Sequence, residues 1–302
     1  MNLEYALGKS FDDLGRYEEA MIHFDRANAI GLQTITARGG LDRAKYADDI
    51  QTRKEIFSRS NLGRASGTGI YDETPIFVVG MIRSGTTLLE HILGRHPLVS
   101  GAGEQNFWIG LESKLIDFDN RRLRDRVLSE AATTYMRLLD RYRGSARRVV
   151  DKQPGNLLLA GALHVAFPEA RIVYMHRDPL DNAISIWNTN VQTSVPFVHD
   201  KGNLAFAMRQ HDGLMHHWEE VLPTDRFMTL SYESLVIDQE ACTRKVLEFC
   251  GLPWTDACLS PEKSKGRVVT PSLWQVRQPV YRTSIGRWKN YEPWLGELVQ
   301  LK

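Results

Sequence analysis

The 302-residue sequence contains little of what marks several classes of protein. Its three cysteines, Cys242, Cys250 and Cys258, are an odd number at eight-residue spacing, which suits neither a CxxC metal knuckle nor a paired disulfide framework. No stretch approaches the roughly 20 apolar residues that a membrane-spanning helix needs, and the opening MNLEYALGKSFDD lacks a basic and apolar signal peptide. We therefore expect buried thiols, no membrane span and a cytoplasmic location.

An excess of one charge is also missing. The 38 basic and 37 acidic side chains leave a formal net charge of +1, so nothing global favours a nucleic-acid or membrane partner. Any anion site has to be local. With 42% hydrophobic residues the chain has an ordinary globular composition, and it is long enough to bury the core of one large or two modest domains.

The first thirty residues have small and aromatic side chains at the spacings of a helix-turn-helix repeat. We assign residues 1–32 to one tetratricopeptide-like helical hairpin. One such hairpin cannot bury its apolar face alone, so it either packs on the rest of the chain or contacts a protein partner, and both alternatives stay open. The positions that fit the repeat are Gly8, Tyr17, Ala20, Phe24 and Ala27.

After the hairpin, the pattern predicts a helical linker over 33–72 and a larger domain over 73–302. Residues 36–59 favour a helix, and Ser60 to Pro75 is rich in Gly, Ser and Thr. Apolar runs then alternate with helical patterns, which predicts βαβ units and a mostly parallel sheet in a three-layer α/β/α, P-loop-like domain. The runs lie at 76–80, 98–100, 147–152 and 170–178, and the helices at 86–95, 105–142, 156–167 and 180–189.

Ligands of parallel sheets bind at the carboxyl ends of the strands. In this chain that rule selects four loops: Met81 to Thr87, Gly101 to Glu104, Asp151 to Pro154, and His176 to Asp181.

The first of these loops, GMIRSGTT, has the glycine frame of a phosphate loop. The exposed amides and the dipole at the start of the following helix favour an anion. A Walker A loop would carry lysine at position 86, whereas this chain has Thr86, with Thr87 at the hydroxyl position and a cation inside the loop as Arg83. A guanidinium can hold an oxyanion without a metal. The glycine frame alone is equally compatible with a strand-to-helix corner that binds nothing.

The second motif is ARIVYMHRDPLDNAISIWNTN. It places Arg177 at a strand end and Ser185 about two helical turns later, which is an arrangement that can bracket a second phosphate. The alternative is a structural ion pair of Arg177 with Asp178 or Asp181.

Together these motifs resemble those of the sulfotransferases that use 3'-phosphoadenosine 5'-phosphosulfate (PAPS). Within that family, the chain is similar to the bacterial branch that follows tetratricopeptide repeats and is related to tyrosylprotein sulfotransferases. The resemblance covers residues 75 to 295, and LSYESLV and QVRQPVYRTSIGRWKNYEPWL contribute to it. One departure in the first loop is Ile82, where a proline is usual.

The resemblance implies roles for individual residues. The first loop would hold the 5'-phosphosulfate, Arg177 and Ser185 the 3'-phosphate, and Tyr232 would lie near the adenine. Three residues near the C-terminus, Ser284, Arg287 and Lys289, would be offered to phosphates. The residues implied for the 5' end are Arg83, Ser84, Gly85, Thr86 and Thr87.

Sulfuryl transfer needs a base for the acceptor proton and cations at the leaving group, and this scheme requires no metal. The resemblance implies Glu104 as the base and Lys152 as the lysine that touches the transferring group, with Ser284 assisting. Without the resemblance, Glu104 would be interpreted as a solvated loop charge, and Lys152 as a surface lysine after an edge strand.

The function expected from the resemblance is sulfuryl transfer from PAPS, leaving adenosine 3',5'-bisphosphate (PAP), with no metal and no nucleic acid. The acceptor would be a hydroxyl, such as that of tyrosine or a carbohydrate, or an amine, on a small molecule, glycan or peptide. Two alternatives stay open: a P-loop kinase or ATPase, and a tetratricopeptide adaptor with an inactive nucleotide fold.

Overall fold

The computed structural model describes residues 1–65, 69–191, 195–263 and 280–302. Part of the C-terminal motif, residues 275–279, lies outside this range. The chain forms two compact units. We call them the hairpin unit (Met1–Asp48, Arg177–Asp212 and Arg282–Lys302) and the sheet unit (Asp49–His176 and Gly213–Tyr281).

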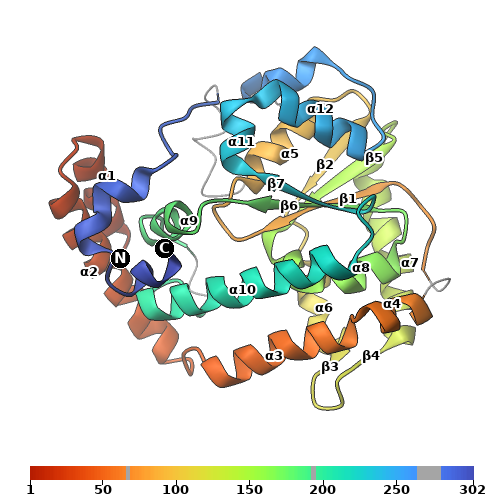
Figure 1. Ribbon diagram of the computed structural model, residues 1–302, viewed down its shortest axis with the longest axis horizontal. Helices are drawn as coiled ribbons and strands as arrows, with labels where there is room; N and C mark the ends of the chain where they lie inside the picture. Colours follow the sequence, from red (N-terminus) through yellow and green to blue (C-terminus); the bar gives the residue numbers. More distant parts are fainter. Residues whose placement is uncertain (66–68, 192–194, 264–279) are drawn as a thin grey trace. The chain divides into compact units, whose positions relative to one another are not determined.

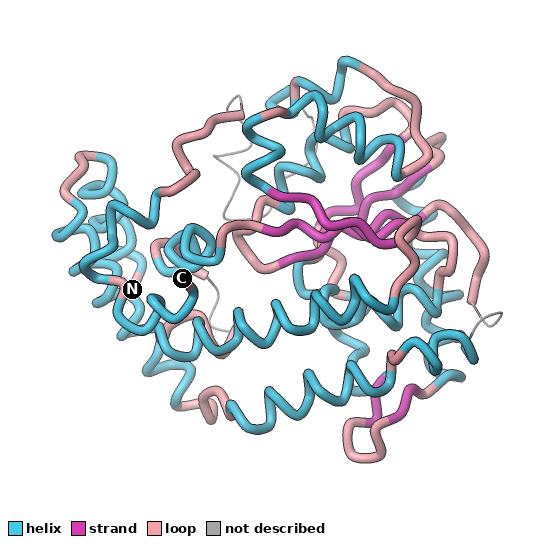
Figure 2. The backbone as a smooth tube through the Cα atoms, viewed as in Figure 1, coloured by secondary structure: helices cyan, strands magenta, loops and turns pink. Residues whose placement is uncertain are grey.

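The sheet unit is built on five strands in the order β2-β5-β1-β6-β7. Every pairing between neighbours is parallel, which confirms the predicted sheet. Figure 2 shows its strands in magenta. The last strand, β7, was not predicted, because its sequence, FMTLS, is short and only Phe227 and Leu230 of it are buried. The strands are β1 (Pro75–Gly80), β2 (Val99–Gly103), β5 (Arg148–Lys152), β6 (Arg171–His176) and β7 (Phe227–Ser231).

Helices cover both faces of this sheet, so the three-layer prediction is also confirmed (Figure 1). The central strands β1 and β5 are buried along their whole length, as expected of near-continuous apolar runs between two helical layers. One layer holds α5 (Thr86–Gly94), α11 (Tyr232–Ile237) and α12 (Gln239–Phe249), and the other holds α6 (Phe107–Leu115), α7 (Asp125–Arg143) and α8 (Ala160–Ala166).

An aromatic cluster fills the second layer. The Trp108 and Tyr135 rings lie 5.1 Å apart between centroids, and Phe77 of β1 stacks on Tyr135 at 5.9 Å. The Tyr135 hydroxyl is buried with them and donates a 2.5 Å hydrogen bond to Oδ2 of Asp151. This contact fixes a carboxylate inside the sheet, one residue before the end of β5.

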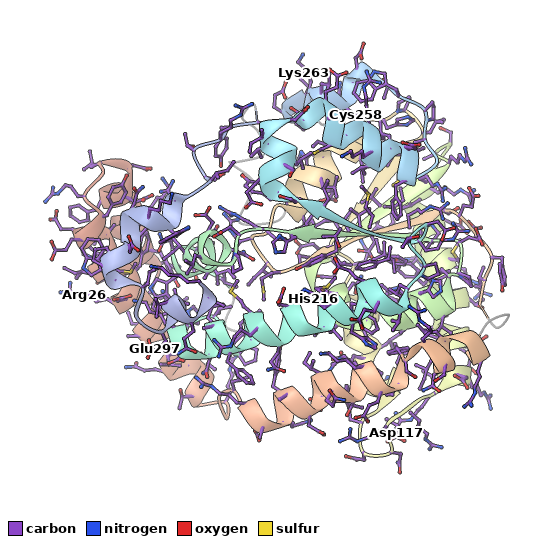
Figure 3. All side chains as sticks on the ribbon, viewed as in Figure 1. Arg26, Asp117, His216, Cys258, Lys263 and Glu297 are labelled. Carbon is purple, nitrogen blue, oxygen red and sulfur yellow. The ribbon has the colours of Figure 1, made fainter. Side chains whose placement is uncertain are left out.

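Shorter elements complete the sheet unit. Helix α4 (Arg59–Ala65) occupies part of the stretch that was predicted to be a Gly/Ser/Thr-rich linker. A small hairpin of β3 (Ile116–Asp117) and β4 (Arg122–Leu123) carries Asp117 (Figure 3). All three cysteines are free and buried, as predicted. Short 3-10 helices are η1 (Pro154–Leu159), η2 (Asp256–Leu259) and η3 (Pro261–Lys263).

The hairpin unit contains α1 (Asn2–Asp13) and α2 (Tyr17–Thr36), which form the predicted helical hairpin. The two helices approach closely at Gly8, where a Cβ would lie 2.6 Å from the Phe24 ring. The predicted helix over 36–59 begins later, as α3 (Arg43–Ile56), and α3 and α10 (Lys201–Val221) contribute to both units. The other elements are α9 (Pro179–Trp187), η5 (Arg287–Trp294) and η6 (Gly296–Leu301).

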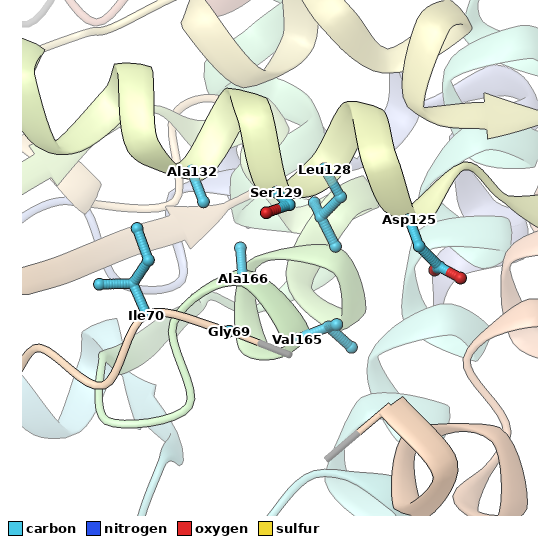
Figure 4. Close-up of a pocket in the computed structure, with 8 residues that line it drawn as sticks. All are labelled: Gly69, Ile70, Asp125, Leu128, Ser129, Ala132, Val165 and Ala166. Atoms are coloured by element: carbon cyan, nitrogen blue, oxygen red, sulfur yellow. The ribbon is translucent and has the colours of Figure 1, made fainter. Parts of the chain in front are cut away.

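None of the described helices is long and apolar enough to cross a membrane. A small pocket of about 30 Å³ lies beside α7 and the end of α8 (Figure 4). It contains none of the predicted site residues. Its lining residues are Gly69, Ile70, Asp125, Leu128, Ser129, Ala132, Val165 and Ala166.

Candidate functional site

The loop between β1 and α5 has the backbone of an anion site. Arg83 adopts a positive φ of 66°, which is uncommon for a residue with a side chain and is found at strained functional turns. Gly85, at φ 104°, precedes α5, and no side chain caps the helix there. The first amides of α5 are therefore left for another acceptor, and a helix N-terminus favours an anion.

The hydroxyl groups of this loop are buried. Ser84 is 1% exposed, and its Oγ has no hydrogen-bond partner among the described residues. Thr86 and Thr87, at the first turn of α5, are also buried. Buried hydroxyls normally have a partner, so an oxyanion that accepts from Ser84 would complete the loop. These groups fit a phosphate or sulfate.

Tyr232 closes over the same loop. It is the first residue of α11, and it is 8% exposed. A Cβ built on Gly85 would lie 2.5 Å from Cδ2 of the Tyr232 ring, so the ring and the loop backbone are in direct contact. The structure thus brings Tyr232 to the loop that the sequence predicted would hold the 5' end of a nucleotide.

Lys152 is the second feature of the site. It ends β5, which lies between β2 and β1, and its side chain is 1% exposed. Its ammonium forms an ion pair with Glu104, which follows β2 and whose side chain is 39% exposed. The interpretation of Lys152 as a surface lysine after an edge strand is therefore wrong. Burial of an ammonium requires such a pairing.

A β-bulge sets this pair. Gly101 of β2 faces Val150 of β5, but Gly103 faces Asp151, so Ala102 is an extra residue in β2. If the register after the bulge continues for one more residue, Glu104 lies beside Lys152. Without the bulge, Gly103 would lie beside Lys152. The bulge thus aligns the carboxylate with the ammonium.

Glu90 is a third member that sequence reasoning missed. It lies on α5 with Oε2 3.8 Å from Nζ of Lys152, and its side chain is only 16% exposed. Burial raises the pKa of Glu90 to about 7, with Glu104 raising it further and Lys152 opposing the shift. The available signal was a lone carboxylate within the apolar pattern TTLLEHIL, one helical turn after Thr86.

The neighbouring Asp151 is also a buried acid. Burial raises its pKa to about 7, and its hydrogen bond from Tyr135 opposes that shift. Lys152 thus pairs with two carboxylates, Glu104 after β2 and Glu90 on α5, whereas the carboxylate of Asp151 bonds to Tyr135 on the other face of the sheet.

The remaining predicted residues belong to the hairpin unit. Arg177 precedes α9, and its Nη2 donates a 3.0 Å hydrogen bond to the carbonyl oxygen of Ser284. Asp178 caps α9, where its Oδ1 accepts from the amide of Asp181 at 2.9 Å. Ser185 is half-buried on the same helix. The predicted 3'-phosphate motif and the C-terminal loop are therefore in contact.

Asp181 holds that loop to α9. Its Oδ2 accepts from the amide of Gly286 at 2.6 Å, and its Oδ1 accepts from the amide of Trp288 at 2.9 Å. Between these two amides, Arg287 forms an ion pair with Asp12 of α1, while Lys289 is exposed. Sequence reasoning found Arg287, considered Asp181 only as an ion-pair partner of Arg177, and missed Asp12, since both aspartates act across more than one hundred residues of chain.

Comparison with known proteins agrees with this architecture. The sequence model of the sulfotransferase family matches residues 75–256, which hold the phosphate loop, Glu104, Lys152 and Arg177. An uncharacterised protein of Aquifex aeolicus is 31% identical over 98% of this chain and 40% of its own length. A protein-tyrosine sulfotransferase of Drosophila melanogaster is 27% identical over 91% of this chain and 55% of its own length. The chain thus spans about half the length of these relatives.

Among solved structures, the sulfotransferase domain of the Synechococcus PCC 7002 olefin synthase aligns with 77% of this chain and 94% of its own, with a TM-score of 0.56 and 19% identity. That likeness supports the fold alone. The family match extends over more than half of the sequence. The chain therefore belongs to the sulfotransferase family.

Proposed function

We propose that the protein moves a sulfuryl group from PAPS to an acceptor hydroxyl or amine. The observation that carries this proposal is the buried Lys152, paired with Glu104 beside a phosphate loop that has no Walker lysine. Family membership and the similarity to a protein-tyrosine sulfotransferase support it.

The donor would be held by the residues that the sequence indicated. Arg83, with the Ser84 hydroxyl and the amides at the start of α5, offers donors to the 5'-phosphosulfate, and Thr86 and Thr87 add buried hydroxyls. Tyr232 would lie against the adenine. Arg177 and Ser185 would serve the 3'-phosphate, and Ser284, Arg287 and Lys289 would be offered to the phosphates of the donor.

When bound, the donor would supply an SO₃ group on a phosphate leaving group. Glu104 is the base in this proposal, because its carboxylate is partly exposed and an acceptor can reach it, whereas Glu90 is largely buried. Lys152 would balance the negative charge that develops at the leaving oxygen, and it is effective there because it is desolvated. Ser284 would assist through its hydroxyl.

The proposed acceptor class includes the tyrosine hydroxyl, which is the group named for the Drosophila relative. Carbohydrate hydroxyls and amines remain within the class, because acceptor pockets are built from loops that vary between members of a fold. An acceptor screen with labelled PAPS would identify the group, with a tyrosine peptide and its phenylalanine counterpart as the first matched pair.

A thermal-shift measurement tests the donor. PAP should raise the melting temperature in the absence of magnesium, because a ligand of the native state stabilises it by mass action. The P-loop kinase alternative predicts the opposite result, a shift with ATP and magnesium and none with PAP. The adaptor alternative predicts no shift with either nucleotide.

A further inference from the structure

We propose that the N-terminal helical hairpin is part of the donor site, where its Asp12 orients Arg287 toward the 3'-phosphate of PAPS. This inference rests on the proposed function and adds a positioning residue to it. It also assigns the hairpin of α1 and α2 a role within this chain (Figure 1).

Asp12 lies near the end of α1 and makes two contacts with the C-terminal segment. Its Oδ2 pairs with Nη2 of Arg287, and its Oδ1 accepts a hydrogen bond from the hydroxyl of Tyr291. Tyr291 is fully buried, and its ring packs edge-on against Tyr17 of α2 with centroids 5.4 Å apart. Both helices of the hairpin therefore contact η5.

Because Asp12 is buried, its carboxylate needs the pairing with Arg287 and the hydrogen bond from Tyr291. The residue is 6% exposed, and a buried carboxylate is costly unless it is paired and hydrogen-bonded. The Arg287 side chain is 36% exposed. Burial alone would lower the pKa of Arg287, but the charge and the hydrogen bond of Asp12 raise it. A guanidinium has five N–H donors in a rigid fork, so pairing one edge with Asp12 fixes the direction of the others.

The backbone on either side of Arg287 is fixed as well. Asp181 of α9 accepts from the amides of Gly286 and Trp288, and Arg177 donates to Ser284. Arg287 thus lies between two amides that α9 holds, and its side chain is held by the hairpin. Because Arg177 of the proposed 3'-phosphate motif contacts Ser284, three residues before Arg287, we assign Arg287 to the same phosphate.

The hairpin is itself attached to α9. Asp25 of α2 accepts from Nε1 of Trp187 at 2.8 Å, and its carboxylate lies 3.1 Å from Nζ of Lys201. Asn28 donates to the carbonyl oxygen of Trp187 at 2.9 Å. The hairpin therefore holds the last turn of α9 and the Arg287 side chain together, which is what a positioning element needs.

The test compares Asp12→Asn with Asp13→Asn in the full chain. Asparagine keeps the size of Asp12 and an acceptor for Tyr291 but removes the charge that pairs with Arg287. Asp13, the next residue of α1, is 62% exposed, pairs with the helix surface residue Lys9, and provides a control of equal charge. Binding of PAP and of adenosine 5'-monophosphate (AMP) is measured by calorimetry.

We expect Asp12→Asn to weaken the binding of PAP about tenfold, which is the size of a typical coupling between contacting residues. The affinity for AMP should be unchanged. Asp13→Asn should bind both ligands normally. The unchanged AMP affinity shows that the variant is folded, and Tyr291→Phe provides a milder second variant with a smaller loss in the same direction. In an Arg287→Gln background, Asp12→Asn should cause no further loss of PAP affinity.

Three outcomes overturn the inference. PAP affinity equal in Asp12→Asn and Asp13→Asn would mean that the contact has no role in the donor site. Tighter PAP binding by Asp12→Asn would mean that Asp12 competes with the phosphate. Additive losses in the Arg287→Gln background would mean that Asp12 does not act through Arg287. A wild-type chain that binds no PAP would instead reject the proposed function.

Discussion

The phosphate loop of the sheet unit and the C-terminal loop of the hairpin unit, both proposed to bind phosphate, are held by different means. The first lies between β1 and α5, and the strand and helix at its two ends determine its course. The second, Ser284 to Lys289, pairs with none of the strands in the described part of the chain. Its backbone and its arginine are held by Arg177, Asp181 and Asp12, which lie 107, 105 and 275 residues from the groups they contact.

Because the two loops are held differently, different substitutions should damage each of them. A loop between two regular elements depends on its own backbone conformation, so glycine substitutions should damage it most. A loop held by distant side chains depends on its partners, so charge-removing substitutions elsewhere in the chain should damage it most. Substitutions in and around the two loops can test this contrast, and the largest effect is expected at the strand ends beside the phosphate loop.

The largest effect is expected for Glu104→Gln. Loss of a general base typically costs about 10² to 10⁴-fold in rate, and donor affinity should stay nearly normal. The measurement is turnover on the acceptor that the screen identifies, together with PAP binding. Glu130→Gln, an exposed glutamate of α7, is the control. Full activity of Glu104→Gln with an unshifted pH profile would remove Glu104 from this role.

Arg177→Ala should have the next largest effect. It removes a charged donor to the 3'-phosphate and also the contact with Ser284, so PAP affinity should fall roughly 10- to 100-fold, as for other hydrogen bonds to charged groups. AMP affinity should change little, since AMP has no 3'-phosphate. Calorimetric titration with both ligands checks this. An equal loss for both would make Arg177 a structural residue.

Gly85→Ala tests the backbone of the phosphate loop. The added Cβ would meet the Tyr232 ring at 2.5 Å, and the backbone φ of 104° disfavours a side chain, so we expect a loss of about 2–3 kcal/mol in unfolding free energy and weaker PAP binding. Gly94→Ala, in the last position of α5 with open space around it, is the matched control and should be neutral or stabilising. Equal stability of the two variants would contradict the close contact.

The smallest effect concerns Glu90 and pH. Its folded pKa of about 7 exceeds its ordinary value of 4.5, so the folded state binds more protons than the unfolded state between these values. Its contribution to stability is therefore present at low pH and is lost as pH rises through about 7. Denaturant unfolding from pH 5 to pH 8 should show this loss in the wild type.

Glu90→Gln should reduce that loss by roughly 1–2 kcal/mol, while Asp151, whose pKa burial also raises to about 7, keeps its own titration. Glu130→Gln should leave the pH dependence unchanged. Identical slopes in Glu90→Gln and the wild type would show that Glu90 titrates normally in the folded protein.

Much of the sheet unit followed from the sequence, because its signals are local. Apolar runs such as IFVVG and RIVYM, each followed by a helical pattern, predicted β1, β6 and the parallel order of their connections. The same regularity placed Glu104 and Lys152 at strand ends. It did not reveal β7, which is short and buries only two of its residues, or α4, whose Ser- and Gly-containing sequence is typical of a linker.

The contacts of the hairpin unit could not be predicted in this way. Asp12 is one of several charged residues on α1, and nothing near it in the sequence distinguishes it from Asp13. Only the fold shows that one is buried against Arg287 and the other is exposed. Glu90 was missed for a related reason, since the burial of a helical carboxylate depends on which strand lies beneath it.

Because of the bulge at Ala102, the number of residues between α5 and Glu104 determines whether Glu104 lies beside Lys152. A residue inserted between Ala102 and Gly103 would change no side chain that contacts Lys152, yet with the bulge otherwise unchanged it would move Glu104 one position along β5, opposite Gln153. The segment should therefore accept many substitutions and reject an inserted residue. Variants of this protein would then be expected to avoid insertions in VSGAGE more strictly than substitutions.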